Sequence, residues 1–141
     1  QYWIDRGYIR INDDCAFHTI VDAVNCFGQS YKPKSIWSAG AKLSDGETYI
    51  WCPKLYPNDK WYNEEIDDII IERCLNESKR DRHVERITES SYHKRIVFAR
   101  VKDNLGQLKY RFKGLYKLDT KDSNKKRQLV WRRIQNRVET F

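Results

Sequence analysis

A run of positively charged side chains in the last third of the chain has the spacing of a β-strand. Lys109, Arg111 and Lys113 occupy alternate positions between apolar and aromatic residues, and Lys117 follows in the same register. On a strand, residues two apart project from one face about 6–7 Å from each other. Successive phosphates along a nucleic-acid strand have a similar spacing, so these side chains could follow a phosphate backbone. The alternative is a solvated sheet face on which lysine discourages edge-to-edge pairing.

The distribution of charge along the chain favours the first interpretation. Residues 93–141 contain 15 Lys/Arg and 4 Asp/Glu, whereas residues 1–92 contain 12 and 16, and the net charge of the whole chain is +7. Charge segregated in this way is typical of a protein that binds a polyanion. The residues that we expect to contact nucleic acid are Lys109, Arg111, Lys113, Lys117, Arg132 and Arg133.

Aromatic residues gather between positions 37 and 62, close to predicted turns. Such a residue at a strand end can stack on an exposed base, which contributes about 1–3 kcal/mol per base. A neighbouring Asp or Asn could then read the edge of that base. Packing in the core is the alternative, because large aromatic side chains are usually mostly buried. The candidates for a base pocket are Trp37, Tyr49, Trp51, Trp61, Asp45 and Asn63.

Two other functions remain open at this point. Asp67, Asp68 and Glu77 could hold Mg²⁺ in a metal-dependent nuclease, although an acidic first helical turn explains most of this acidic pattern. A protein–protein interaction module, docking through the acidic front or the basic sheet, is the other. The chain has no glycine-rich nucleotide-binding loop and no zinc-finger spacing of Cys and His, so we expect no cofactor.

These side chains must be positioned by helices and strands that the sequence also predicts. Apolar residues at spacings of three and four predict a helix over residues 13–27, ended by Gly28. A second helix is predicted near residues 64–75, where acidic residues fill the first turns. We expect the charged residues 76–91 to form a loop or a frayed helix.

Alternating patterns predict the strands. Residues 35–43 and 48–55 flank an Asp-Gly turn and form a hairpin, and residues 93–118 contain the clearest alternation in the chain. A polar loop over 120–127 precedes a last strand over 128–134. The fold class is therefore α+β, with a strongly curved mixed or antiparallel sheet, in the form of a small barrel, and helices packed on it.

Composition places the chain among intracellular domains. Its 141 residues suit a single domain over 1–141, and a start at Gln1 with no methionine anywhere suggests excision from a longer protein. We find neither an apolar run of membrane-spanning length nor a signal peptide. Four scattered cysteines without such a signal favour a reducing compartment, the cytoplasm, where they would serve as small buried hydrophobes.

The segments Arg95-Ile-Val-Phe-Ala-Arg-Val-Lys-Asp, Tyr110-Arg-Phe-Lys-Gly-Leu-Tyr-Lys-Leu-Asp and Val130-Trp-Arg-Arg-Ile resemble the tail of accessory domains in bacterial restriction and defence proteins. The wider chain is similar in pattern to the PUA-like superfamily, which includes the SET- and RING-associated, YTH and EVE domains. The resemblance implies a bent barrel that holds a modified or flipped base in an aromatic pocket. It also implies a recognition module tethered to a nuclease or helicase, with DNA favoured over RNA as its partner and catalysis in another domain.

Overall fold

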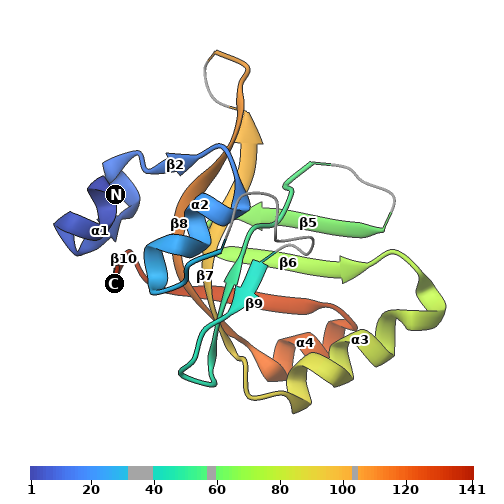
Figure 1. Ribbon diagram of the computed structural model, residues 1–141. Coiled ribbons are helices and arrows are strands. Elements are labelled where there is room, and N and C mark those ends of the chain that lie inside the picture. Colours follow the sequence, from blue (N-terminus) through green and yellow to red (C-terminus); the bar gives the residue numbers. More distant parts are fainter. Residues whose placement is uncertain (32–39, 57–59, 103–104) are drawn as a thin grey trace.

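One long, strongly curved sheet organises the molecule (Figure 1). The computed structural model describes residues 1–31, 40–56, 60–102 and 105–141. Within these residues the strand order is β3-β4-β7-β8-β9-β6-β5, with β2 paired to β8. The strands are β2 (Ala16–Phe17), β3 (Gly40–Lys42), β4 (Thr48–Trp51), β5 (Trp61–Ile66), β6 (Ile69–Cys74), β7 (Lys94–Lys102), β8 (Leu108–Leu118) and β9 (Leu129–Gln135).

The sheet is mixed and does not close on itself. β4 and β7 are parallel, the other pairs are antiparallel, and β3 and β5 remain as the two edges. A separate two-stranded sheet joins the ends of the chain through β1 (Tyr8–Arg10) and β10 (Arg137–Glu139). The prediction of an α+β fold with a strongly curved sheet is confirmed, but the barrel is open.

Helices cover both faces of the sheet. They are α1 (Tyr2–Arg6), α2 (Ile20–Val24), α3 (Glu77–Glu89) and α4 (Thr120–Lys126), with the 3-10 turns η1 (Ile11–Asp13) and η2 (Asn25–Phe27). None of the helices in the described part of the chain is long and apolar enough to cross a membrane.

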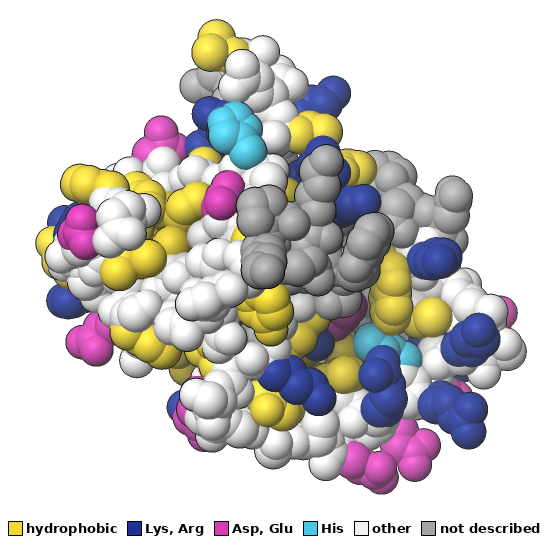
Figure 2. All heavy atoms as spheres, in the orientation of Figure 1, with side chains coloured by type: hydrophobic (Ala, Val, Ile, Leu, Met, Phe, Trp, Pro, Cys, Tyr) yellow, Lys and Arg dark blue, Asp and Glu magenta, His cyan; other side chains and the backbone are white. Residues whose placement is uncertain are grey.

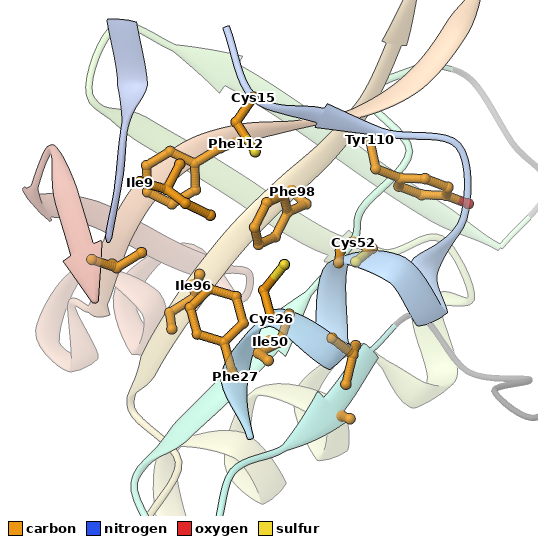
Figure 3. Packing of buried hydrophobic residues seen from close by; sticks show 14 of the residues in the cluster. Ile9, Cys15, Cys26, Phe27, Ile50, Cys52, Ile96, Phe98, Tyr110 and Phe112 are labelled. Atoms are coloured by element: carbon orange, nitrogen blue, oxygen red, sulfur yellow. The ribbon is translucent and has the colours of Figure 1, made fainter. Parts of the chain in front are cut away.

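The central strand β7 is buried on both sides because its alternate residues enter two different cores. Phe98 lies in the first core, where its ring centroid is 5.4 Å from that of Phe112 and 6.1 Å from that of Phe27 (Figure 3). Val97 and Ala99 lie in the second core beneath α3, with Trp131 among its members. All four cysteines are buried and free, as the sequence predicts.

Two predicted helices differ from the structure: the first is shorter than predicted, and the second is a β-hairpin. The helix over 13–27 is reduced to α2 and η2, because Asp14 takes a left-handed backbone conformation and β2 pairs with β8 before Thr19 caps α2. Gly28 is left-handed where it ends η2, as predicted. The helix near 64–75 is instead the β5–β6 hairpin, which turns at Asp67 with a positive φ of 53°.

The local reasons for these differences can be read from the structure. Isoleucines 69, 70 and 71 suit a strand, and Glu72 points inward to a charged partner that the sequence alone does not reveal. The helix follows one segment later as α3, where the Asn76 side chain accepts a hydrogen bond from the Ser78 backbone N–H. Residues 120–126 are the helix α4 rather than a loop, capped by Asp119.

Candidate base-binding pocket

The curved sheet encloses a cavity of about 1100 Å³ on the side that carries α3. Its walls come from β4, the β5–β6 hairpin, α3 and the start of β7, elements far apart in the sequence. Figure 2 shows this side of the molecule, where Lys and Arg side chains surround a hollow that contains hydrophobic and histidine side chains. The cavity is large enough for a small organic ligand, for which sites of about 300–1,000 Å³ are usual.

The base of the cavity is a buried charge pair held between tryptophans. The Arg95 Nη1 lies 2.9 Å from Glu72 Oε1, and the two side chains are 7% and 9% exposed. The guanidinium lies 4.0 Å from the ring centroid of Trp131 and 4.5 Å from that of Trp51. Trp131 Nε1 donates to the same carboxylate oxygen at 3.3 Å. Four side chains from β4, β6, β7 and β9 therefore fix one another.

The protonation of Glu72 follows from these contacts. Burial alone would raise the pKa of its carboxyl, but the charge of Arg95, together with His83 and the Trp131 N–H, lowers that pKa to about 2. Glu72 is therefore a carboxylate at neutral pH, and Arg95 stays charged beside it.

His83 enters the cavity from α3, and its neighbours determine which ring nitrogen carries the proton. The Arg86 guanidinium lies 3.3 Å from His83 Nδ1. Because a guanidinium can only donate, Nδ1 must accept, which places the proton on Nε2 in the neutral ring. Nε2 lies 3.9 Å from Glu72 Oε1, too far for a hydrogen bond. The Trp61 ring meets the His83 ring edge-on, with 4.6 Å between centroids.

Three buried polar atoms in the walls of the cavity have no hydrogen-bond partner among the described residues. They are Asn63 Oδ1, His83 Nε2 and Arg95 Nε. Leaving such an atom unpaired costs about 1–3 kcal/mol, so buried groups of this kind normally have partners. The residues that carry one unpaired acceptor and two unpaired donors thus line one cavity with aromatic walls, and sites for flat polar ligands combine such walls with a few polar groups.

Comparison with known proteins identifies the fold. The model of the SET and RING associated (SRA) domain matches residues 2–140. The chain belongs to the SRA family. Among solved structures, the 5-hydroxymethylcytosine-specific restriction enzyme AbaSI matches with a TM-score of 0.85 and 38% sequence identity. The match covers all of this chain and 45% of that enzyme, so the SRA domain spans under half the length of its relative. No curated protein matches the chain.

The family match confirms the prediction of a DNA-recognition module that belongs to the SET- and RING-associated family. An SRA domain is a DNA-binding module, and the matched region is only part of the AbaSI enzyme. Asp67 lies at the hairpin turn and Asp68 forms an ion pair with Arg133. The described ranges contain no group of three or more His, Cys, Asp or Glu that could hold a metal.

The SRA domain brings four of the six predicted pocket residues into one cavity. Tyr49, Trp51, Trp61 and Asn63 all line it. Trp51 is only 4% exposed, and its ring packs against the Arg95 guanidinium. Asp45 does not line this cavity, because its carboxylate is occupied in the β3–β4 turn. There it accepts hydrogen bonds from the backbone N–H groups of residues 47 and 48 and from the Thr48 hydroxyl. Trp37 lies outside the described residues.

Most of the predicted phosphate-binding cations have carboxylate partners within the SRA domain. Arg111 Nη1 lies 2.7 Å from Asp14, and Lys113 Nζ lies 3.4 Å from Glu65. Arg133 pairs with Asp68, and Arg132 with Asp119 and Asp122. Lys117 is exposed on the same strand as Lys109. These pairs do not test DNA binding, so the role of the six cations stays a prediction.

Other positive side chains surround the mouth of the pocket. Lys42, Lys54, Lys60 and Arg86 are exposed and line it. Neither Lys42 nor Lys54 has a carboxylate within 4.0 Å in the part of the chain that the structure describes. Lys42 Nζ lies 4.9 Å from the ring centroid of Tyr92, at the edge of the same cavity.

Sequence reasoning missed the pair at the base of the pocket, although a signal was present. Arg95, Val97 and Ala99 occupy alternate positions of one strand, so their side chains point to the same face. This predicts that the Arg95 side chain points inward. Glu72 similarly alternates with Ile70 and Cys74. Two inward charges of opposite sign on apolar strands predict a buried ion pair. Only His83, which comes from a segment expected to be irregular, had no such signal.

Proposed function

We propose that this SRA domain takes a 5-hydroxymethylcytosine base, flipped out of duplex DNA, into the pocket between β4, the β5–β6 hairpin and α3. The observation that carries the proposal is that the residues with the unpartnered buried atoms Asn63 Oδ1, His83 Nε2 and Arg95 Nε all line one aromatic-walled cavity. The enzyme AbaSI, 38% identical over the whole chain, is specific for 5-hydroxymethylcytosine.

The polar atoms of the pocket match a cytosine in number and kind. The pairing edge of cytosine has one amino donor and two acceptors, a ring nitrogen and a carbonyl oxygen. Asn63 Oδ1 can accept from the amino group, while the N–H groups of His83 and Arg95 can donate to the acceptors. Guanine presents the opposite balance, with two donors and one acceptor. It would leave one of the protein donors without a partner, at a cost of about 1–3 kcal/mol.

Trp61 is the residue we propose to stack on the flipped base. Trp61 lines the cavity, meets the His83 ring edge-on and is partly exposed. Flipping costs a few kcal/mol, which stacking and hydrogen bonds to the pairing edge must offset.

The cations at the mouth of the pocket, Lys42, Lys54, Lys60 and Arg86, would contact the phosphates on either side of the flipped nucleotide. Lys109 and Lys117 on β8 would add contacts farther along the duplex, as the sequence predicts. We also propose that the domain is tethered to a nuclease domain in a cytoplasmic restriction protein, since AbaSI contains a further 55% of chain beyond the matched region.

The test is binding to duplexes that differ at one cytosine, which is unmodified, 5-methylated or 5-hydroxymethylated. Wild-type protein should prefer the 5-hydroxymethylcytosine duplex. Trp61→Ala should lose about 1–3 kcal/mol of binding free energy, the value of one stacked base. Asn63→Leu should weaken binding to all three duplexes, because they share the amino group from which Asn63 Oδ1 would accept. A 2-aminopurine placed opposite the modified base should brighten when the base flips.

A matched control is Asn124→Ala, which removes an exposed amide from α4 outside the pocket. It should leave both affinity and preference unchanged. Equal binding to all three duplexes by the wild-type protein, or an Asn63→Leu variant with unaltered affinity, would refute the assignment of the base to this cavity.

A further inference from the structure

A second cluster of positive charge lies around Tyr8, on the small β1–β10 sheet. The guanidinium carbons of Arg6, Arg137 and Arg10 lie 4.1, 4.2 and 5.3 Å from the centroid of the Tyr8 ring. None of these residues lines the base pocket. In Figure 1, α1 and β10 lie on the opposite side of the molecule from α3 and β5. The cluster is therefore a separate feature of the surface.

The charges of this cluster are not balanced by nearby carboxylates. Asp13 is occupied by Arg6, which meets its two oxygens at 3.0 and 3.3 Å. Arg10 Nε remains 3.7 Å from Asp13, beyond hydrogen-bond distance. Arg137 has no carboxylate within 4.0 Å in the described ranges. Glu139, which lies across from Tyr8, has no Lys or Arg nitrogen within that distance among the same residues. Of the three guanidinium groups, only those of Arg6 and Arg10 lie within 4.0 Å of a carboxylate in the described ranges, and both lie near the same one, Asp13.

The strand register adds a second argument. Arg10 and Arg137 lie directly opposite each other on antiparallel strands, a position where like charges destabilise a sheet. Arg6, and then the charges of Arg10 and Arg137, also lower the pKa of the Tyr8 hydroxyl. Both facts indicate a local excess of positive charge, which an anion would relieve.

We propose that Arg6, Arg10, Tyr8 and Arg137 form a phosphate-binding site that contacts the DNA backbone at a distance from the base pocket. A guanidinium is suited to this role because its donors match the geometry of phosphate oxygens. Tyr8 holds the planar groups by stacking and can donate its own hydroxyl proton to the same phosphate. The inference rests on DNA being the ligand of the domain, but not on which base the pocket reads.

The site predicts a loss of affinity that is independent of base modification. Arg10→Gln/Arg137→Gln should weaken binding about fivefold to tenfold at 0.1 M salt for modified and unmodified duplexes alike, and reduce the slope of log K against log salt by about 0.9 per lost phosphate contact. Thermal stability should not fall, because the like-charged pair is removed. Glu139→Gln should tighten binding, since it removes a neighbouring negative charge.

The controls separate this site from general electrostatics and from the pocket. Lys121→Gln/Lys125→Gln removes two exposed cations from α4 and should leave the slope nearly unchanged. An equal loss in both double variants, or unaltered affinity in Arg10→Gln/Arg137→Gln, would overturn the proposal. A wild type without preference for 5-hydroxymethylcytosine would refute the pocket assignment alone.

Discussion

Glu72 and Arg95 show how a single buried carboxylate supports the pocket. Glu72 accepts from Arg95 and from Trp131 within a site almost closed to solvent. Replacing Glu72 by Gln keeps the shape but leaves the Arg95 charge unpaired. Breaking a buried pair in this way costs about 3–5 kcal/mol, so Glu72→Gln should lose that much stability in urea unfolding at pH 7.

A surface carboxylate provides the control for that variant. Glu47 pairs with Lys94 at 3.1 Å, but its side chain is 56% exposed. Exposed pairs contribute about 0–1 kcal/mol after screening by solvent, so Glu47→Gln should be close to neutral. Equal losses in the two variants would contradict a special role for Glu72.

The lowered pKa of Glu72 also predicts how stability depends on pH. The folded-state pKa is about 2, whereas the ordinary value is 4.5. Because folding favours the charged form, the stability that Glu72 contributes is fully present above about pH 4.5 and is lost as the pH falls toward 2. Unfolding free energies measured between pH 6 and 2.5 should therefore fall more steeply for wild type than for Glu72→Gln. Parallel curves would show that Glu72 is not held ionised.

At the scale of elements, Gly114 lets β8 bend across the sheet. Its φ is +114°, and a Cβ there would lie 2.7 Å from the Gln135 carbonyl oxygen and 2.8 Å from Arg133 Cδ. Gly114→Ala should therefore destabilise the protein by roughly 3 kcal/mol or more, from backbone strain and overpacking together. Gly106 also has a positive φ, +79°, but open space around it. Gly106→Ala should cost only about 1–2 kcal/mol, and equal Tm losses would show that the close approach to β9 is unimportant.

The elements differ in how well the sequence predicts them, for identifiable reasons. The strands β7 and β8 have strong alternation over nine and eleven residues, and the structure confirms them. The β5–β6 hairpin was predicted as a helix, because Ile66, Ile69 and Ile70 fit both periods. What decides between them is the pairing of β6 with β9 and of Glu72 with Arg95. Both contacts join residues distant in sequence, which no local pattern contains.

The residues of the pocket also differ in how well the sequence predicts them. The sequence predicts Trp61 and Asn63 as pocket residues because aromatic and amide residues near turns can read a base, and both line one cavity. It predicts Asp45 for the same reason, yet the Asp45 carboxylate accepts hydrogen bonds within its own turn. No local pattern predicts His83, because only the packing of α3 on the sheet brings it against Trp61.

At the scale of the whole molecule, the charge segregation of the sequence is partly neutralised by folding. Among the residues that the structure describes, cations of the basic part pair with carboxylates of the acidic part in six places. The pairs are Lys94–Glu47, Arg95–Glu72, Arg111–Asp14, Lys113–Glu65, Arg127–Asp81 and Arg133–Asp68. The net charge of +7 remains, and part of it lies at the mouth of the pocket.

This distribution predicts which cations contribute to DNA binding. Lys42→Gln/Lys54→Gln removes two rim cations without carboxylate partners in the described residues, and should lower the slope of log K against log salt by about 1.8, for two phosphate contacts. Lys113→Gln/Arg133→Gln removes the same charge from groups already paired with Glu65 and Asp68, and should change the slope by much less.

The two double variants are matched in charge, so long-range attraction falls equally in both. A difference in slope therefore measures direct phosphate contact, because counterion release requires a phosphate to be neutralised at the interface. Titrations of one duplex at several salt concentrations, with circular dichroism to confirm folding, provide the measurement. If the slope of log K against log salt decreases more in Lys113→Gln/Arg133→Gln, the DNA follows β8, as the cation spacing of the sequence predicts. The DNA must then displace the carboxylates of Glu65 and Asp68 as it binds.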